Sequence, residues 1–282
     1  MEILITNDDS YMSRGLASLM GIMKPFGNIT VLAPKIQQSA TGCSVTMGHR
    51  PIVFRELGEK DGVRWMYLDG TPASCVKFAI DNVFTDRKPD IVVSGINHGS
   101  NAGAAACYSG TLGAAMEAAI NRIPAVGVSL DDLRSDADFS VVERCFPDIF
   151  KNLLGSLQAR YGIFYNVNFP NLPYEKIKGV RVAHQGIGHW VEEFEDWDPD
   201  FFESHGIDPA LYGIASVKVI SEEGEKTYVM RGHFEDYEDN EPGADHRLLA
   251  EGYITITAHN ADSTDRAEVA RLRALGLDSD WK

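Results

Sequence analysis

The chain has 282 residues, 44% of them hydrophobic and 24% charged, which is the composition of a globular protein with a sizeable core. Its 26 basic and 41 acidic side chains give a formal net charge of -15, and a surface of that sign repels nucleic acid backbones and anionic membranes. No apolar run approaches the roughly 18 residues of a membrane span, and no signal-peptide pattern precedes the first strand. We therefore expect a cytoplasmic protein whose partners include neither a nucleic acid polymer nor a membrane.

The first expected element is a short apolar strand that ends in acidic residues. It is followed at once by Asn7, Asp8 and Asp9, and ligands of open α/β sheets bind beyond the carboxyl ends of the strands. Two neighbouring carboxylates repel each other unless a cation neutralises them, and hard oxygen ligands suit Mg²⁺, Mn²⁺ or Ca²⁺. The pattern therefore indicates a divalent-metal site. The alternative is that Asp9 or Ser10 caps the helix that begins near Arg14.

A helix and a second strand come next. Residues 14–24 carry apolar side chains at helical spacing and stop at a Pro-Phe-Gly sequence, and residues 29–33 read as a buried strand that ends at a proline. This βαβ order predicts a parallel sheet with a right-handed crossover. No GxGxxG motif follows the first strand, so a nicotinamide oxidoreductase loses support.

The loop after the second strand, residues 35–42, is polar and holds Ser39. If the first two strands are neighbours, Ser39 and the aspartates share one rim of the sheet. A hydroxyl can ligate a hard metal, whereas a serine in a turn more often binds only backbone groups. A hairpin-like pair over 51–54 and 63–68 follows. A Thr-Pro step then predicts a helix over 71–84.

A second polar loop follows another buried strand. The strand covers residues 90–93, and the loop over 94–103 is rich in glycine, serine and asparagine. Small residues allow the backbone to approach a ligand closely, and Asn97 and Asn101 supply amide groups. His98 is a candidate general acid in the same loop, although loop histidines often only form hydrogen bonds.

An alanine-rich helix begins after this loop with Ser109, Gly110 and Thr111. Such a helix start offers free backbone N–H groups, two hydroxyls and the positive end of the helix dipole, which together suit a phosphate. The alternative is a serine or threonine cap on a helix whose small residues pack closely on the sheet. That alternative explains the helix, but it does not explain why a second strand ends in an asparagine-rich loop.

Taken in order, these motifs resemble the SurE family of survival proteins, which are 5'/3'-nucleotidases. The resemblance covers the N-terminal two thirds of the chain in detail. It implies a Rossmann-like, mostly parallel three-layer α/β sheet and hydrolysis of nucleoside 5'- and 3'-monophosphates, with short polyphosphate as a further substrate. It also implies one divalent cation per subunit, Mg²⁺ or Mn²⁺ with Ca²⁺ able to occupy the site. The expected assembly is a homodimer that exchanges C-terminal elements, or a tetramer formed by two such dimers.

Carried over residue by residue, the resemblance assigns roles to each motif. Asp8, Asp9 and Asn97 would be catalytic, with Asp8 positioning or deprotonating the attacking water. The metal ligands would be Asp8, Asp9, Ser39 and Asn97, and the phosphate would lie against Asn7, Asn101, Ser109, Gly110 and Thr111. The alternative function is a non-catalytic nucleotide-binding or stress-sensing module, which would keep the phosphate site without turnover.

The remaining expected elements complete the core and extend it. Residues 1–185 are predicted to form the catalytic core, residues 186–247 a projecting arm or lid that takes part in dimerisation, and residues 248–282 a segment exchanged between subunits. The alternative for the arm is an ordinary surface segment that contacts no partner and covers no site. Within these parts we expect strands at 124–130, 163–169, 180–183, 214–220, 227–231 and 253–257, and helices at 137–160, interrupted at Pro147, and at 262–275.

Overall fold

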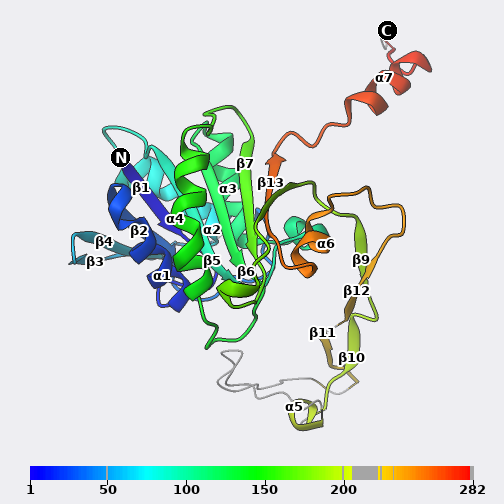
Figure 1. Cartoon of the computed structure of the whole chain (residues 1–282), viewed down its shortest axis with the longest axis horizontal. Helices are drawn as coiled ribbons and strands as arrows, with labels where there is room; N and C mark the ends of the chain where they lie inside the picture. Colours follow the sequence, from blue (N-terminus) through cyan, green and yellow to red (C-terminus); the bar gives the residue numbers. More distant parts are fainter. Residues whose placement is uncertain (49, 199, 205–221, 223, 231, 280–282) are drawn as a thin grey trace.

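The computed structural model describes residues 1–48, 50–198, 200–204, 222, 224–230 and 232–279. Within them, the fold is organised around a nine-stranded sheet with the order β3-β4-β2-β1-β5-β6-β7-β13-β8 (Figure 1). The pairs β3–β4 and β7–β13 are antiparallel and the other neighbours are parallel, which confirms the mostly parallel sheet. Its strands are β1 (Glu2–Thr6), β2 (Asn28–Pro34), β3 (Phe54–Lys60), β4 (Val63–Leu68), β5 (Ile91–His98), β6 (Ala125–Leu130), β7 (Ile163–Phe169), β8 (Val180–Ala183) and β13 (Ile254–Asn260).

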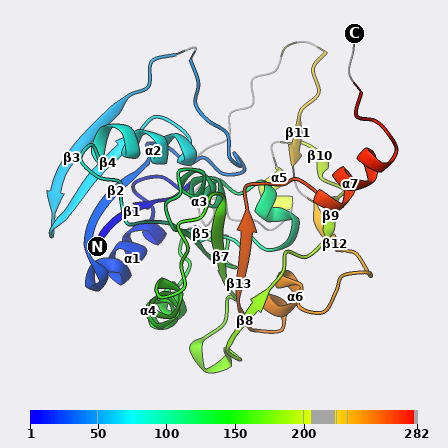
Figure 2. The same cartoon turned by 90° about the horizontal axis from the view of Figure 1, so that it is seen from above.

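Helices cover both faces of this sheet and make the core a three-layer α/β structure (Figure 2). One face carries α1 (Arg14–Met23) and α4 (Ser140–Leu154). The other carries α2 (Pro72–Phe78), which runs on into the π-helical η2 (Ala79–Val83), and α3 (Gly110–Ile120). Three short 3₁₀ turns join these elements: η1 (Lys24–Phe26), η3 (Gly103–Cys107) and η4 (Tyr174–Lys176).

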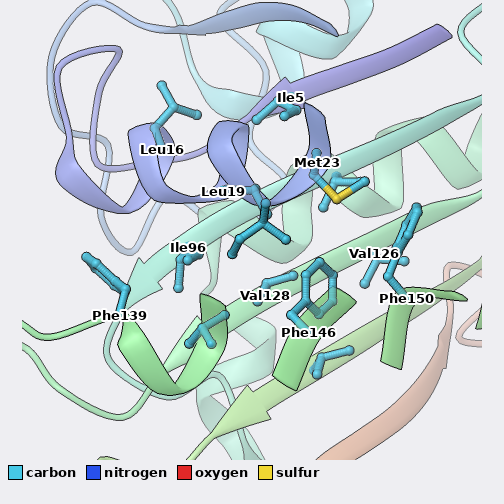
Figure 3. Packing of buried hydrophobic residues seen from close by; sticks show 14 of the residues in the cluster. Ile5, Leu16, Leu19, Met23, Ile96, Val126, Val128, Phe139, Phe146 and Phe150 are labelled. Carbon is cyan, nitrogen blue, oxygen red and sulfur yellow. The ribbon is translucent and has the colours of Figure 1, made fainter. Parts of the chain in front are cut away.

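The larger hydrophobic cluster lies under α1 and α4. Figure 3 shows Leu19 and Met23 of α1 on the side of the helix toward Phe146 and Phe150 of α4, and these four side chains and that of Leu16 are fully buried. Burying one such side chain contributes about 1.5–3 kcal/mol. This packing fixes α1 on the sheet, and therefore it also fixes the turn between β1 and α1 that holds the acidic residues.

The edge hairpin differs from its prediction. We expected its first strand over 51–54, but β3 begins at Phe54 and runs to Lys60. Every residue of β3 is exposed, so the strand has none of the alternating apolar pattern that reveals a half-buried strand. The turn is formed by Asp61 and Gly62, both with positive φ (54° and 76°), which is the arrangement that two-residue hairpin turns require.

Helix α4 is shorter than its predicted range of 137–160, and it passes through Pro147 without interruption. The proline removes one backbone hydrogen bond. Val142, Phe146 and Phe150 nevertheless keep a continuous buried stripe against the sheet on both sides of it. The burial of that stripe outweighs the missing bond.

The arm leaves the core after β8 and forms two small antiparallel pairs, β9 with β12 and β10 with β11 (Figure 1). β11 matches the expected strand at 227–231, whereas the strand expected at 214–220 lies outside the described residues. No helix in the described part of the chain is long and apolar enough to cross a membrane. The arm elements are β9 (Gly188–Val191), β10 (Phe194–Asp196), α5 (Phe201–Ser204), β11 (Tyr228–Met230) and β12 (His233–Asp236).

The chain returns to the core through α6 (Asp245–Ala250) and β13. We expected an edge or exchanged strand over 253–257, but β13 is longer and pairs on both sides, with β7 and β8 of its own chain. After it, α7 (Arg266–Ala274) has no buried residue and lies apart from the sheet (Figure 1). The exchange of this segment between subunits, and the division into three parts, stay predictions.

Candidate functional site

The acidic residues lie just beyond the carboxyl end of β1, between the strands β2 and β5. The chain proceeds from β1 to β2 on one side and later returns to β5 on the other, so this is a topological switch point, where open α/β sheets bind ligands. Asn7 and Asp8 are buried, and only 9% of the Asp9 side chain is exposed. The capping alternative is wrong, because the cap of α1 is Ser13, whose hydroxyl accepts the Leu16 N–H.

Asn7 is held inside the same turn. Its Nδ2 donates to the Ser10 carbonyl oxygen at 3.0 Å and to the Ser13 hydroxyl at 2.7 Å. Its Oδ1 is buried, and the described residues offer that atom no hydrogen-bond partner. The amide donor of Asn7 is therefore occupied, while its acceptor oxygen is buried without a partner among the described residues. A phosphate contact from Asn7 stays a prediction, and it would have to use the backbone N–H.

The third strand of the site extends further than predicted. We expected β5 to end at residue 93, but it continues to His98 and pairs with β6 again at Asn97 and His98 after a register shift. Gly95 lies at the irregularity with a φ of 137°, and a Cβ there would stand 2.3 Å from the Val128 carbonyl oxygen. Such bulges redirect the side chains that follow them. Here the redirected residues are Asn97 and His98, and His98 reaches Asp9 beyond the end of β1.

Helix α3 begins directly against Asp8. Ser109 is its N-cap and accepts the Leu112 N–H at 3.0 Å, as the capping alternative expected. A Cβ on Gly110 would lie 2.8 Å from Asp8 Cβ and 2.9 Å from Asp8 Oδ2, so only glycine allows this approach. Thr111 is fully buried and donates its hydroxyl to Asp8 Oδ1 at 2.5 Å. The predicted phosphate-binding turn and the predicted metal site are therefore in direct contact.

Asp8 has a pKa far from that of an ordinary aspartate. Burial, and then the negative charge of Asp9, raise its pKa to about 7. The Thr111 hydroxyl opposes the shift but does not cancel it. A cation beside the two carboxylates would neutralise their repulsion. Without a cation, Asp8 titrates near neutral pH.

Asp9 is bound to His98, a contact that the sequence pattern did not predict. Its Oδ2 accepts the His98 Nδ1 at 2.8 Å and the His98 backbone N–H at 3.3 Å. The imidazole also packs edge-on against Phe139, with 5.2 Å between the ring centroids. Asp9 and His98 are 89 positions apart in the sequence. Only their shared place at the ends of neighbouring parallel strands hinted at proximity.

The other predicted residues are placed differently. Gln38 N–H donates to the Asp8 carbonyl oxygen at 2.7 Å, which brings the Ser39 loop beside the site. Ser39 itself is exposed, and its hydroxyl accepts Gln37 Nε2 at 2.9 Å. Its role as a ligand stays a prediction that requires a change of side-chain direction.

Asn101 is held more firmly, within a buried polar network. Its backbone N–H donates to Asn168, its Nδ2 donates to Ser129, and its carbonyl oxygen accepts from Asn166, each at 2.8 Å. All of these residues come from the β6–β7 side of the sheet. The network fixes the loop that leads into η3, and with it the approach to α3.

The ligand types at the end of β1 fit a hard divalent cation. Asp8 and Asp9 have carboxylate oxygens, and the Nδ2 of Asn97 donates to the Gly99 carbonyl oxygen at 2.8 Å, so a metal ligand from Asn97 would be its amide oxygen. Carboxylate and amide oxygens are the ligands that a hard cation prefers. Among the described residues, no group of three or more His, Cys, Asp or Glu side chains is arranged to hold a metal ion.

Comparison with known proteins gives one consistent family. The family described as survival protein SurE matches residues 3–192. A 5'-nucleotidase SurE from Cytophaga hutchinsonii is 35% identical over 281 residues, covering 99% of this chain and 96% of the relative. A 5'-nucleotidase SurE from Bacteroides fragilis is 35% identical over 266 residues, covering 93% of this chain and 92% of the relative. The crystal structure of a SurE protein from Aquifex aeolicus matches with a TM-score of 0.75 at 30% identity, covering 98% of this chain and 100% of that chain.

Proposed function

The chain belongs to the SurE family of survival proteins, and from that membership we propose that it is a metal-dependent phosphomonoesterase. Its substrates would be nucleoside 5'- and 3'-monophosphates, with short polyphosphate as a further substrate, and its products nucleoside and inorganic phosphate. Relatives that carry the name 5'-nucleotidase align with nearly the whole chain, which supports the reaction class.

The observation that carries the proposal is the contact between Asp8 and the first turn of α3. It joins a pair of carboxylates, which suit a cation, to a helix N-terminus, which suits a phosphate. A phosphate bound beside this contact would meet positive partial charge from the helix amides and the charge of the cation. A module that only binds nucleotides would need the helix amides but would not need the carboxylate pair.

The residues of the chain divide the work as follows. Asp8 would orient the attacking water and accept the proton that it loses. The N–H groups at the start of α3, around Gly110 and Thr111, would stabilise the charge that develops on the transferred phosphoryl group. Asp9 and Asn97 would complete the oxygen ligands. When bound, the divalent cation supplies Lewis-acid polarisation of a phosphate oxygen and lowers the pKa of a bound water.

The test is phosphate release from a panel of nucleoside 5'- and 3'-monophosphates and short polyphosphate, with Mg²⁺, Mn²⁺ or a chelator present. We expect metal-dependent turnover by the wild type and a loss of about 10²–10⁴-fold in Asp8→Asn, the usual worth of a positioned acid–base group. Asp81→Asn makes the same chemical change at an exposed position outside the site and serves as the control. If folded wild type binds nucleotide but releases no phosphate with any metal, the enzyme proposal fails and the non-catalytic binding module is favoured.

We also propose a homodimer, or a tetramer built from dimers, with the C-terminal segment as part of the interface. The supporting observation is α7, which buries no residue and is followed by Leu275 and Leu277, 61% and 64% exposed. Light scattering on the eluting chain should give at least twice the monomer mass. A variant ending at Ala261 should form an assembly with fewer subunits. The same number of subunits before and after the truncation would refute a role for the segment in assembly.

A further inference from the structure

The imidazole of His98 contacts both Asp9 and the ring of Phe139. Its Nδ1 lies 2.8 Å from Asp9 Oδ2, and only 13% of its side chain is exposed. Its Nε2 is fully buried, and no hydrogen-bond partner for that atom exists among the residues the structure describes. Both ring nitrogens are therefore withdrawn from solvent, one by Asp9 and one by packing.

The proton positions follow from the partner of Nδ1. An ionised carboxylate only accepts hydrogen bonds, so Nδ1 carries a proton that it donates to Asp9. The edge-to-face contact with Phe139 keeps the ring in this orientation. The backbone N–H of His98 donates to the same Oδ2. Two donors from one residue thus hold one oxygen of Asp9, and neither of these bonds uses the other oxygen.

We propose that His98 is a positioning residue, which orients Asp9 as a metal ligand through Nδ1 and takes no part in proton transfer to the leaving group. Hydrogen bonds from neighbouring groups to ligating carboxylates orient the ligand, and their loss weakens metal affinity about 10–100-fold. A general acid would need a ring nitrogen directed at the leaving oxygen, and Nε2 is enclosed instead. This inference rests on the metal site of the proposed function.

The test uses three substitutions that separate the two ring nitrogens. In His98→Asn the amide nitrogen stands near the place of Nδ1, in His98→Gln it stands near the place of Nε2, and His98→Ala removes both. Binding of Mn²⁺ is followed by the electron paramagnetic resonance signal of the free ion, which needs no substrate. We expect the dissociation constant for Mn²⁺ to rise about 10-fold or more in His98→Ala and in His98→Gln, and to stay within about 3-fold of wild type in His98→Asn.

Turnover distinguishes positioning from acid catalysis. If His98 only positions Asp9, saturating Mn²⁺ restores the kcat of His98→Ala to within about 3-fold of wild type, for a nucleotide and for p-nitrophenyl phosphate alike. If His98 were a general acid, His98→Ala would bind Mn²⁺ as tightly as wild type. Its kcat at saturating metal would stay low for the nucleotide, whose leaving group needs a proton, but would be normal for p-nitrophenyl phosphate, whose leaving group does not. That result would overturn the inference. If the wild type itself binds no Mn²⁺, the metal site of the proposed function fails, and the inference fails with it.

Discussion

Asp8 offers the most direct test of how the site is built, because its burial costs stability in the metal-free protein. The folded-state pKa of about 7 lies above the ordinary value of 3.8. An acid with a raised folded pKa stabilises the fold below its unfolded pKa, and that contribution is lost as the pH rises through the folded pKa. Metal-free protein should therefore lose stability between about pH 4 and pH 7 through this one group.

The magnitude follows from the shift. One pKa unit corresponds to 1.36 kcal/mol, so ionising Asp8 at pH 8 costs the metal-free fold about 4 kcal/mol, and at pH 5 the cost is about 2 kcal/mol. Asp8→Asn keeps the shape and an acceptor for the Thr111 hydroxyl but carries no charge. We expect the metal-free variant to be more stable than wild type, with an advantage that grows by about 2–3 kcal/mol from pH 5 to pH 8.

Urea unfolding followed by circular dichroism, in chelator at pH 5, 6, 7 and 8, measures this difference. Asp81→Asn controls for the removal of one negative charge from a chain with a net charge of -15. Adding Mn²⁺ at pH 8 should then stabilise the wild type more than the variant, because a ligand that binds only the folded state adds stability by mass action. An advantage for Asp8→Asn that does not change with pH would show that Asp8 is not forced to ionise in a buried site, and the reasoning would be refuted.

Three further substitutions test the contacts around the site. Gly110→Ala places a Cβ 2.8 Å from Asp8 Cβ and should reduce kcat/KM at least about 100-fold, as a displacement of about 1 Å in a reacting group does, whereas Gly155→Ala, with no atom within 4 Å, should leave it unchanged. Ser13→Ala removes the cap of α1 and should lower the free energy of unfolding by about 1–2 kcal/mol in urea, and an unaltered midpoint would contradict the capping role. Asp245 is fully buried and accepts three backbone N–H groups, those of residues 103, 186 and 246, so Asp245→Ala should cost about 3 kcal/mol or more; hydrogen exchange at residue 103 that matches wild type would argue against this anchor.

Local patterns in the sequence were sufficient for the features that depend on neighbouring residues. The end of β1 at Asn7, the Thr71 cap followed by proline at the start of α2, and the Ser109 start of α3 are all found where they were predicted. Each depends on a few consecutive residues: an apolar run that stops, or a hydroxyl placed before a helix. The same kind of signal placed Asp8, Asp9 and Asn97 at the ends of parallel strands, and therefore on one edge of the sheet.

The contacts that assemble the site were decided by the order of the strands, which no local pattern records. β5 continues to His98 because it pairs with β6 again after the register shift, and its extra length turns a predicted loop histidine into a partner of Asp9, 89 residues away. The Thr111 hydroxyl meets Asp8 across 103 residues for the same reason. Amphipathic patterns tell which side chains are buried, but not against which neighbour. The neighbour sets the pKa of Asp8 and the direction of Asp9, so the chemistry of this site follows from the tertiary packing.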